Sequence, residues 1–330
     1  MKVAGFTLVE WLVAMVLGLF LLAGVLSVFV AARSNTGSAI EQSSLLENGR
    51  LAMRLLTQDL RWAGFWGDYT GLPMQVGSGL ALSAGAQVPM SKDCFDERSE
   101  GSLPSAVAPA RAIWIAHIDS SKAMSGLGCV TASNRIADSD VLTIRRLIGL
   151  PQSSALDDNR FYLATTSQSA YLFPGNETPP DETAMPHRQI WEYQYHLYYL
   201  YPSAGGGHEL RKRMLTVNGG SWLISGALVS GVEKMVLQCG VDTSVVADGK
   251  LDKFVAASDV TAQEWNEGRV LAVRVYLLMR AAQPDRGYVN RQIYQLGHVT
   301  VSGNGDGYRR LLLESTVALR NPLLVAGGGE

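Results

Sequence analysis

The sequence has little that would mark an enzyme or a nucleic-acid-binding protein. Its net charge is −2 and its pI is near 6.2, so it offers no basic surface to attract nucleic acid. It has no GxSxG, no Walker-type loop and no GxGxxG before a helix. Its five histidines are scattered, with no HExxH and no i, i+4 pair: His117, His187, His196, His208 and His298. We therefore expect no catalytic residue, no cofactor and no metal site.

Cysteine is also scarce, with three residues in 330. Cys94 and Cys129 lie in an irregular region and are candidates for a disulfide in an oxidising compartment, whereas Cys239 lies in an apolar, strand-like run and is expected to be a buried thiol. The sequence alone leaves the pairing open. Acidic residues around Gly249 faintly resemble a calcium loop but lack the 12-residue pattern, so we expect a solvated turn there.

Charge is almost absent from the N-terminal segment 6–32, whose 27 residues include a single ionisable side chain, Glu10. Roughly 20 apolar residues suffice to span a bilayer as a helix. A lone carboxylate in such a helix costs about 2.5–3.5 kcal/mol on insertion scales, so it suggests a function or a partner. The alternative is a carboxyl that stays protonated or lies near the lipid headgroups.

An ordinary secretory signal does not fit this segment, because the apolar run is about twice the usual 7–15 residues and the small residues Ala4-Gly5 precede it. A plain signal anchor explains the length but leaves Glu10 and the Gly5-Phe6 junction unexplained. The flanking charges are nearly balanced between Lys2 and Arg33. A span so close to the N-terminus most simply inserts with residues 1–5 in the cytoplasm and the large domain outside.

A second, amphipathic helical pattern follows over residues 41–64. Its polar side chains fall on one stripe and its apolar ones on a wide opposite arc, as in a helix packed on a domain. The apolar arc contains Leu45, Ala52, Met53, Leu56, Leu60 and Ala63, with Leu51, Leu55 and Trp62 on a flank. We predict one helix from Phe6 to Trp62. A separate membrane helix and soluble helix, divided near residues 34–38, is the alternative.

Beyond residue 64 the pattern indicates β structure. Residues 67–79 and 81–109 are rich in Gly, Ser, Pro and Ala and predict a loop-dominated insert. The strongest alternation is at 190–201, where six large side chains share one face, and 208–215 is expected to pair back on it. The other predicted strands are 112–118, 141–147, 161–164, 232–241, 270–281, 292–301 and 308–319.

The N-terminus carries a resemblance in Gly5-Phe6-Thr7-Leu8-Val9-Glu10. A short charged leader that ends in Gly, followed by this motif and an apolar helix, resembles the class III signal of type IV pilins and of the pseudopilins of type II secretion. The resemblance implies cleavage between Gly5 and Phe6 by a prepilin peptidase and methylation of the new Phe6 amine. It also implies that Glu10 pairs with the N-terminal amine of a neighbouring subunit.

Segments 231–242, 273–280 and 316–322 resemble the PilW-type minor pilins, relatives of the J-type minor pseudopilins. The implied fold is α+β, with a long N-terminal helix lying across antiparallel sheet and followed only by strands. The implied division is a cleaved leader (1–5), a transmembrane and assembly half of the helix (6–32), an amphipathic half (33–64) and a periplasmic β-rich domain (65–330).

The function implied is that of a minor pilin that initiates type IV pilus assembly and enters the fibre near its tip, supporting twitching motility and adhesion. Its partners would be other minor and major pilins, the prepilin peptidase, the inner-membrane assembly platform and the membrane, with no nucleic acid. A J-type pseudopilin of type II secretion is the alternative within the family. A signal-anchored periplasmic enzyme or binding protein is a remote one.

Overall fold

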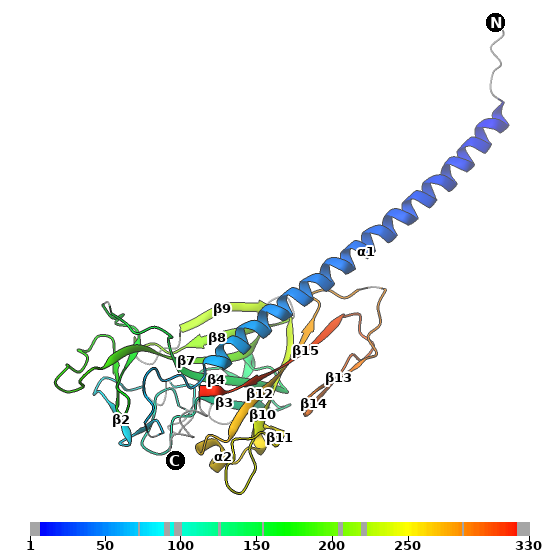
Figure 1. The fold of residues 1–330 in the computed structure, drawn as a ribbon. Helices are drawn as coiled ribbons and strands as arrows, with labels where there is room; N and C mark the ends of the chain where they lie inside the picture. The colour runs from blue at the N-terminus through cyan, green and yellow to red at the C-terminus, as the bar shows by residue number, and fades with distance from the viewer. Residues whose placement is uncertain are drawn as a thin grey trace.

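The computed structural model describes residues 7–71, 73–88, 93–95, 101–124, 127–153, 155–203, 207–218, 223–285 and 287–321. For residues 30, 31, 33–38 and 223–225 it describes the backbone alone. Over these ranges the chain combines one long N-terminal helix with mostly antiparallel sheets (Figure 1). The predicted α+β, pilin-like fold is confirmed.

Helix α1 is continuous from Leu8 to Trp62. Its 55 residues extend about 80 Å at 1.5 Å per residue. Its N-terminal half projects from the β domain, and its C-terminal half lies against the sheets (Figure 1). The prediction of one helix is confirmed from Leu8 onward, and the alternative of two separate helices is wrong, because the backbone stays helical through residues 34–38.

The larger sheet has nine strands in the order β1-β2-β6-β5-β7-β4-β3, with β8 paired to β7 and β9 to β8. All pairs are antiparallel except β1–β2 and β2–β6. The strands are β1 Gln75–Val76, β2 Gly79–Leu82, β3 Ile113–Ile118, β4 Ser139–Leu147, β5 Phe161–Thr165, β6 Ala170–Pro174, β7 Gln189–Pro202, β8 His208–Met214 and β9 Leu223–Ser230.

A second, four-stranded antiparallel sheet has the order β11-β10-β12-β15, and β13 and β14 form a separate hairpin. The strands are β10 Val232–Val241, β11 Lys253–Ala256, β12 Val270–Arg280, β13 Ile293–Leu296, β14 Val299–Ser302 and β15 Arg310–Ala318. The short helix α2 is Ala262–Asn266, and 3-10 turns cover Ala132–Asn134 and Ala257–Asp259.

Most predicted strands are present within one or two residues of their expected bounds, including β8 paired back on β7. Two expectations were wrong. The predicted strand 292–301 is the hairpin β13–β14, which turns at Gly297, a residue with φ of +58°. Helix α2 interrupts a region expected to contain only strands. The described part of the insert is dominated by loops, as predicted, and includes the short strands β1 and β2. Strands β6, β9 and β11 were not predicted.

The larger sheet is buried on both faces, which explains the continuous burial of its central strands. On β7, Tyr198 and Leu200 face a core shared with α1 and the four-stranded sheet. The alternate residues Tyr195, Leu197 and Tyr199 face a second core, covered by the insert. An alternating strand buried on both sides lies at the centre of a layered structure. The β7 aromatics are therefore core residues.

The C-terminal half of α1 packs against β15, β12 and β9. Five residues of the predicted apolar arc are buried: Leu45, Ala52, Leu56, Leu60 and Ala63. Leu51 and Trp62, predicted on its flank, are exposed by 44% and 42%, so the contact stripe is narrower than expected. Gly49 permits a close approach of α1 to β15, because a Cβ there would lie 2.3 Å from Cδ1 of Leu313.

Candidate functional site

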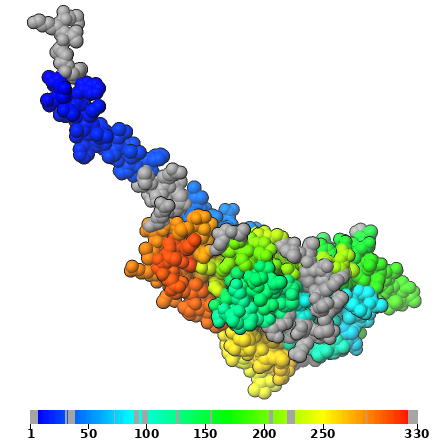
Figure 2. All heavy atoms as spheres, turned by 180° about the vertical axis from the view of Figure 1, so that it is seen from behind, coloured from blue at the N-terminus to red at the C-terminus, as the bar shows by residue number. Residues whose placement is uncertain are grey.

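The exposed half of α1 is the principal candidate for the functional surface. Among the described residues, Leu8–Phe29 is the one helical stretch long and apolar enough to cross a membrane, and none of its tested window is buried in the domain. Figure 2 shows this half as a narrow rod leaving the globular body. Large side chains such as Trp11 and Phe20 are exposed by 63% and 74%. Such a surface requires an apolar surrounding, either lipid or other helices.

Glu10 lies in the first turn of this helix and forms a capping box with Thr7. The Thr7 amide donates to Oε2 of Glu10 over 2.9 Å, and the Glu10 amide donates to Oγ1 of Thr7 over 3.3 Å. These bonds satisfy two of the amides that every helix start leaves without a partner. Gly5 and Phe6, the predicted cleavage and methylation sites, lie outside the described residues.

A buried polar network fixes the other half of α1 to the larger sheet. Oδ1 of Asp59 accepts a hydrogen bond from Nε of Arg146 over 2.6 Å. Oδ2 accepts from the Tyr198 hydroxyl over 2.8 Å and lies 2.6 Å from Nδ1 of His196. Asp59 and His196 are 6% and 2% exposed. The network joins α1 to β4 and β7, and sequence reasoning missed it.

The charges in this network are set by burial and pairing. Burial alone would raise the pKa of Asp59, but His196, Arg146 and Tyr198 together hold it well below its usual range. Burial lowers the pKa of His196 and outweighs the attraction of Asp59. Nε2 of His196 has no hydrogen-bond partner among the described residues, so a proton there would be buried unsatisfied. Asp59 is therefore ionised and His196 neutral near pH 7.

Cys94 and Cys129 form a disulfide in the structure, across 35 residues of sequence. Cys94 is fully buried in the core beneath the insert. Next to it, Oδ2 of Asp93 accepts hydrogen bonds from the amide and hydroxyl of Ser102. The disulfide joins the insert to the loop between β3 and β4, and the Asp93 carboxylate connects two parts of the insert. Cys239 is a buried free thiol on β10.

The acidic loop around Gly249 is a closed turn. Asp242 accepts hydrogen bonds from the backbone amides of Ser244, Asp248 and Gly249 over 2.9–3.0 Å. Its oxygens are thus bonded to the loop itself, which fits the expected turn.

Three other titratable residues, far apart in sequence, meet at one end of β3. A ring nitrogen of His117, a carboxylate oxygen of Asp140 and a ring nitrogen of His298 all lie within 4.8 Å of one another. No local spacing in the sequence signalled this cluster.

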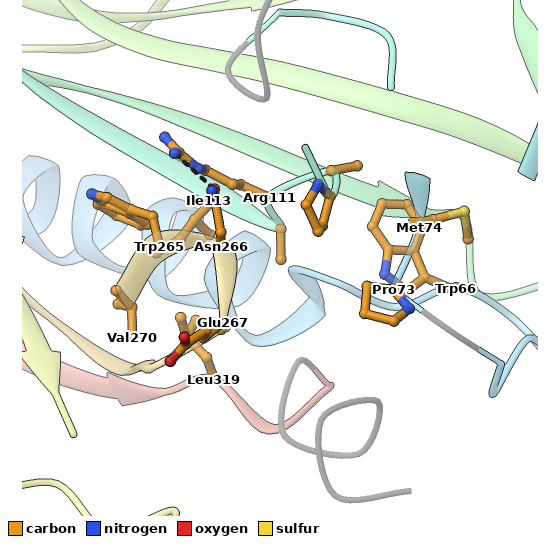
Figure 3. A pocket seen from close by; sticks show the side chains of 14 residues that line it. Trp66, Pro73, Met74, Arg111, Ile113, Trp265, Asn266, Glu267, Val270 and Leu319 are labelled. Atoms are coloured by element: carbon orange, nitrogen blue, oxygen red, sulfur yellow. Dashed lines mark hydrogen bonds between the residues drawn. The ribbon is translucent and has the colours of Figure 1, made fainter. Parts of the chain in front are cut away.

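A pocket lies between the start of β3, helix α2 and the end of β15 (Figure 3). Its guanidinium, from Arg111, donates to Oδ1 of Asn266 over 3.0 Å and lies over the rings of Trp114 and Trp265. Among the described residues of its wall, Glu267 is the other charged one. The bond between Arg111 and Asn266 thus holds α2 beside the start of β3, and the described polar groups of the pocket include no nucleophile–base pair.

An apolar N-terminal helix that projects from an antiparallel β domain defines a pilin-like protein. Two family models match this chain. Residues 1–26 match the prokaryotic N-terminal methylation motif, and residues 197–321 match the type IV pilus-assembly protein W family, PilW. The predicted resemblance to PilW-type minor pilins is confirmed. No curated protein and no solved structure shows significant similarity to the chain.

The two matches cover different parts of the molecule. The N-terminal match spans residues 1–26, which include most of the exposed half of α1. The PilW match begins within β7 and includes the whole four-stranded sheet against which α1 packs. The two matches and the exposed apolar helix support a membrane-anchored, pilin-like protein that associates with pilus components.

Proposed function

We propose that this chain is a minor pilin that helps to initiate type IV pilus assembly and is incorporated near the tip of the fibre. The observation that carries the proposal is the exposed apolar half of α1, Leu8–Phe29, on a chain that matches both pilin family models. The role is structural rather than catalytic, and it supports pilus biogenesis, twitching motility and adhesion.

In this proposal the prepilin peptidase removes residues 1–5 on the cytoplasmic face of the inner membrane, and the new Phe6 amine is methylated. The helix then anchors the chain with its domain in the periplasm. The assembly platform lifts it into a bundle formed by the helices of other minor and major pilins. Since lipid and bundle are both apolar, the transfer exposes no large apolar surface to water.

Glu10 has a specific role in this transfer. Its Oε2 is engaged by the Thr7 cap, and the negative charge of the carboxylate attracts the positive amine of a neighbouring subunit's mature N-terminus. A charge pair compensates two groups that would each be costly to bury alone. Because the pair forms at one depth only, it also sets the axial register between subunits.

The proposal is tested by the chemistry of the N-terminus and by pilus counts. Mass spectrometry of the purified chain should find N-methylated Phe6 at the start, and a Gly5→Leu variant should remain uncleaved. A deletion strain should lose surface pili, with rescue by the wild type and not by Gly5→Leu. An intact Met1, or cleavage near residue 30, would refute the pilin assignment.

The alternative within the family is a J-type minor pseudopilin of type II secretion, which shares the N-terminal features. Loss of protein secretion with normal pili in the deletion strain would favour it. The match to the methylation motif argues against a signal-anchored periplasmic enzyme or binding protein.

A further inference from the structure

The strands bring together two imidazoles and a carboxylate at the junction between the β13–β14 hairpin and the larger sheet. His117 is on β3, Asp140 is opposite it on β4, and His298 is in the turn of the hairpin. One nitrogen or oxygen atom from each lies within 4.8 Å of the others. From this geometry we propose that His117, Asp140 and His298 form a binding site for a divalent transition metal ion, with zinc the best match.

The two rings have the spacing that a shared metal requires. Imidazole nitrogens bind zinc at about 2.0–2.1 Å, and at a tetrahedral angle this places the two ring centres about 5 Å apart. The ring centres of His117 and His298 are 5.3 Å apart and their planes are inclined by 68°. Small side-chain movements therefore suffice to direct one nitrogen of each ring toward the same ion.

Asp140 holds the His117 ring in position at the site. Its side chain is almost fully buried, its Oδ2 accepts the Leu237 amide over 2.6 Å, and its Oδ1 lies 2.6 Å from Nδ1 of His117. A carboxylate bonded to a histidine ring is the usual support of a zinc-binding imidazole, because it fixes the ring and increases its basicity. Asp119 and Asp138 lie close enough to act electrostatically on His117, so the surroundings favour a cation.

A metal at this position would join the hairpin to the sheet. His298 follows Gly297 in the exposed turn, whereas the hairpin's inner residues Tyr294 and Leu296 pack on the outer face of the four-stranded sheet. The ion would add a link between this hairpin and β3 of the other sheet. Zinc should therefore protect the hairpin amides from exchange.

The test uses the full chain in detergent, with any affinity tag removed, and zinc chloride as the probe. Calorimetry should show one zinc ion bound per chain, and the melting temperature should rise with the logarithm of zinc concentration. His298→Asn should weaken binding at least tenfold, and Asp140→Asn should also weaken it. His187→Asn is the matched control, because His187 is also exposed and its φ of +59° suits asparagine.

Hydrogen exchange should slow in residues 293–302 on adding zinc, and cobalt should give the visible absorption of a nitrogen- and oxygen-ligated ion. Because His298 is exposed, its replacement should leave the fold intact, which the melting temperature without zinc verifies. Absence of binding at millimolar zinc overturns the proposal. So does binding that His298→Asn leaves unchanged or that His187→Asn weakens equally.

Discussion

The Asp59 carboxylate of α1 lies 2.6 Å from Nδ1 of His196 on β7, across 137 residues of sequence. Arg146 and Tyr198 bind the same carboxylate, so one acidic side chain connects the helix to two strands of the larger sheet. The contact is almost fully buried. This contact therefore couples the packing of α1 to the stability of the β domain.

Asp59→Asn should destabilise the domain by about 1.5–3 kcal/mol, because it removes the buried carboxylate that binds the partly buried Arg146 guanidinium. Chemical denaturation of the full chain in detergent measures the change. Asp158→Asn, at an exposed loop position, should change stability by less than about 0.5 kcal/mol. Equal losses in the two variants would show that the network contributes nothing specific.

The same pair predicts a loss of stability in acid. The pKa of His196 is lowered in the folded state, so the unfolded chain binds a proton first, and stability falls as pH drops below about 6.5. The pKa of Asp59 is also lowered, so a further loss begins below about pH 4. Melting temperatures between pH 8 and pH 3 measure both steps.

His196→Asn should remove the first step while keeping a donor to Asp59. Because other histidines also titrate in this range, the informative quantity is the difference between the wild-type and variant curves. If the two curves run parallel from pH 8 to pH 5, His196 is not the group responsible.

Gly49→Leu should lower the stability of the domain by about 1–3 kcal/mol, since the new side chain would overlap Leu313 and Met279. Thermal unfolding of the full chain measures this. Gly24→Leu is the matched control, because a Cβ at Gly24 meets nothing within 4 Å. A similar loss of stability in both variants would contradict the close packing of α1 on β15.

Glu10→Gln separates the two roles of this residue. Glutamine keeps the capping box, because its side-chain oxygen also accepts the hydrogen bond from the Thr7 amide, but it removes the charge. The variant should be inserted and cleaved normally, yet its incorporation into pili should fall several-fold. Immunoblots of sheared pili against membrane fractions measure the ratio. Wild-type incorporation would count against the pairing with a neighbouring amine.

Reducing the disulfide should destabilise the insert. Opening the Cys94–Cys129 link frees a long loop in the unfolded chain, with a typical loss of about 2–4 kcal/mol. Dithiothreitol should lower the melting temperature of the wild type and leave that of the Cys94→Ser, Cys129→Ser double variant unchanged. A reductant effect of the same size in both proteins would assign the change to another cause.

Local patterns in the sequence were enough to predict the long helix and most strands. The apolar periodicity of α1 and the alternation in β7 involve residues close together in the sequence, so both can be recognised without knowledge of the fold. The turn at Gly297 was missed, although a glycine between two short apolar runs is a hairpin signal. The Thr7–Glu10 capping box was also readable, because threonine precedes glutamate by three positions.

The remaining features depend on contacts between distant segments. Asp59 lies next to Leu60 on the packed face of α1, but nothing near it indicates Arg146 or His196 as partners. The cluster of His117, Asp140 and His298 likewise forms only when β3 pairs with β4 and the hairpin folds beside them. Such sites have no fixed spacing along the chain, so pattern reasoning could not find them.

Because α1 is one continuous helix, the orientation of the β domain about the helix axis is fixed relative to the membrane-spanning half. Each residue of an α-helix turns the chain by about 100° and advances it by about 1.5 Å. Deleting one residue between Phe29 and Leu45 would thus rotate the whole β domain by about 100° around the axis of α1. Inserting seven residues, about two helical turns, would leave the domain in nearly the same orientation and place it about 10 Å farther from the membrane-spanning half. In the proposed fibre, the number of residues in that segment would therefore decide which side of the domain faces a neighbouring subunit.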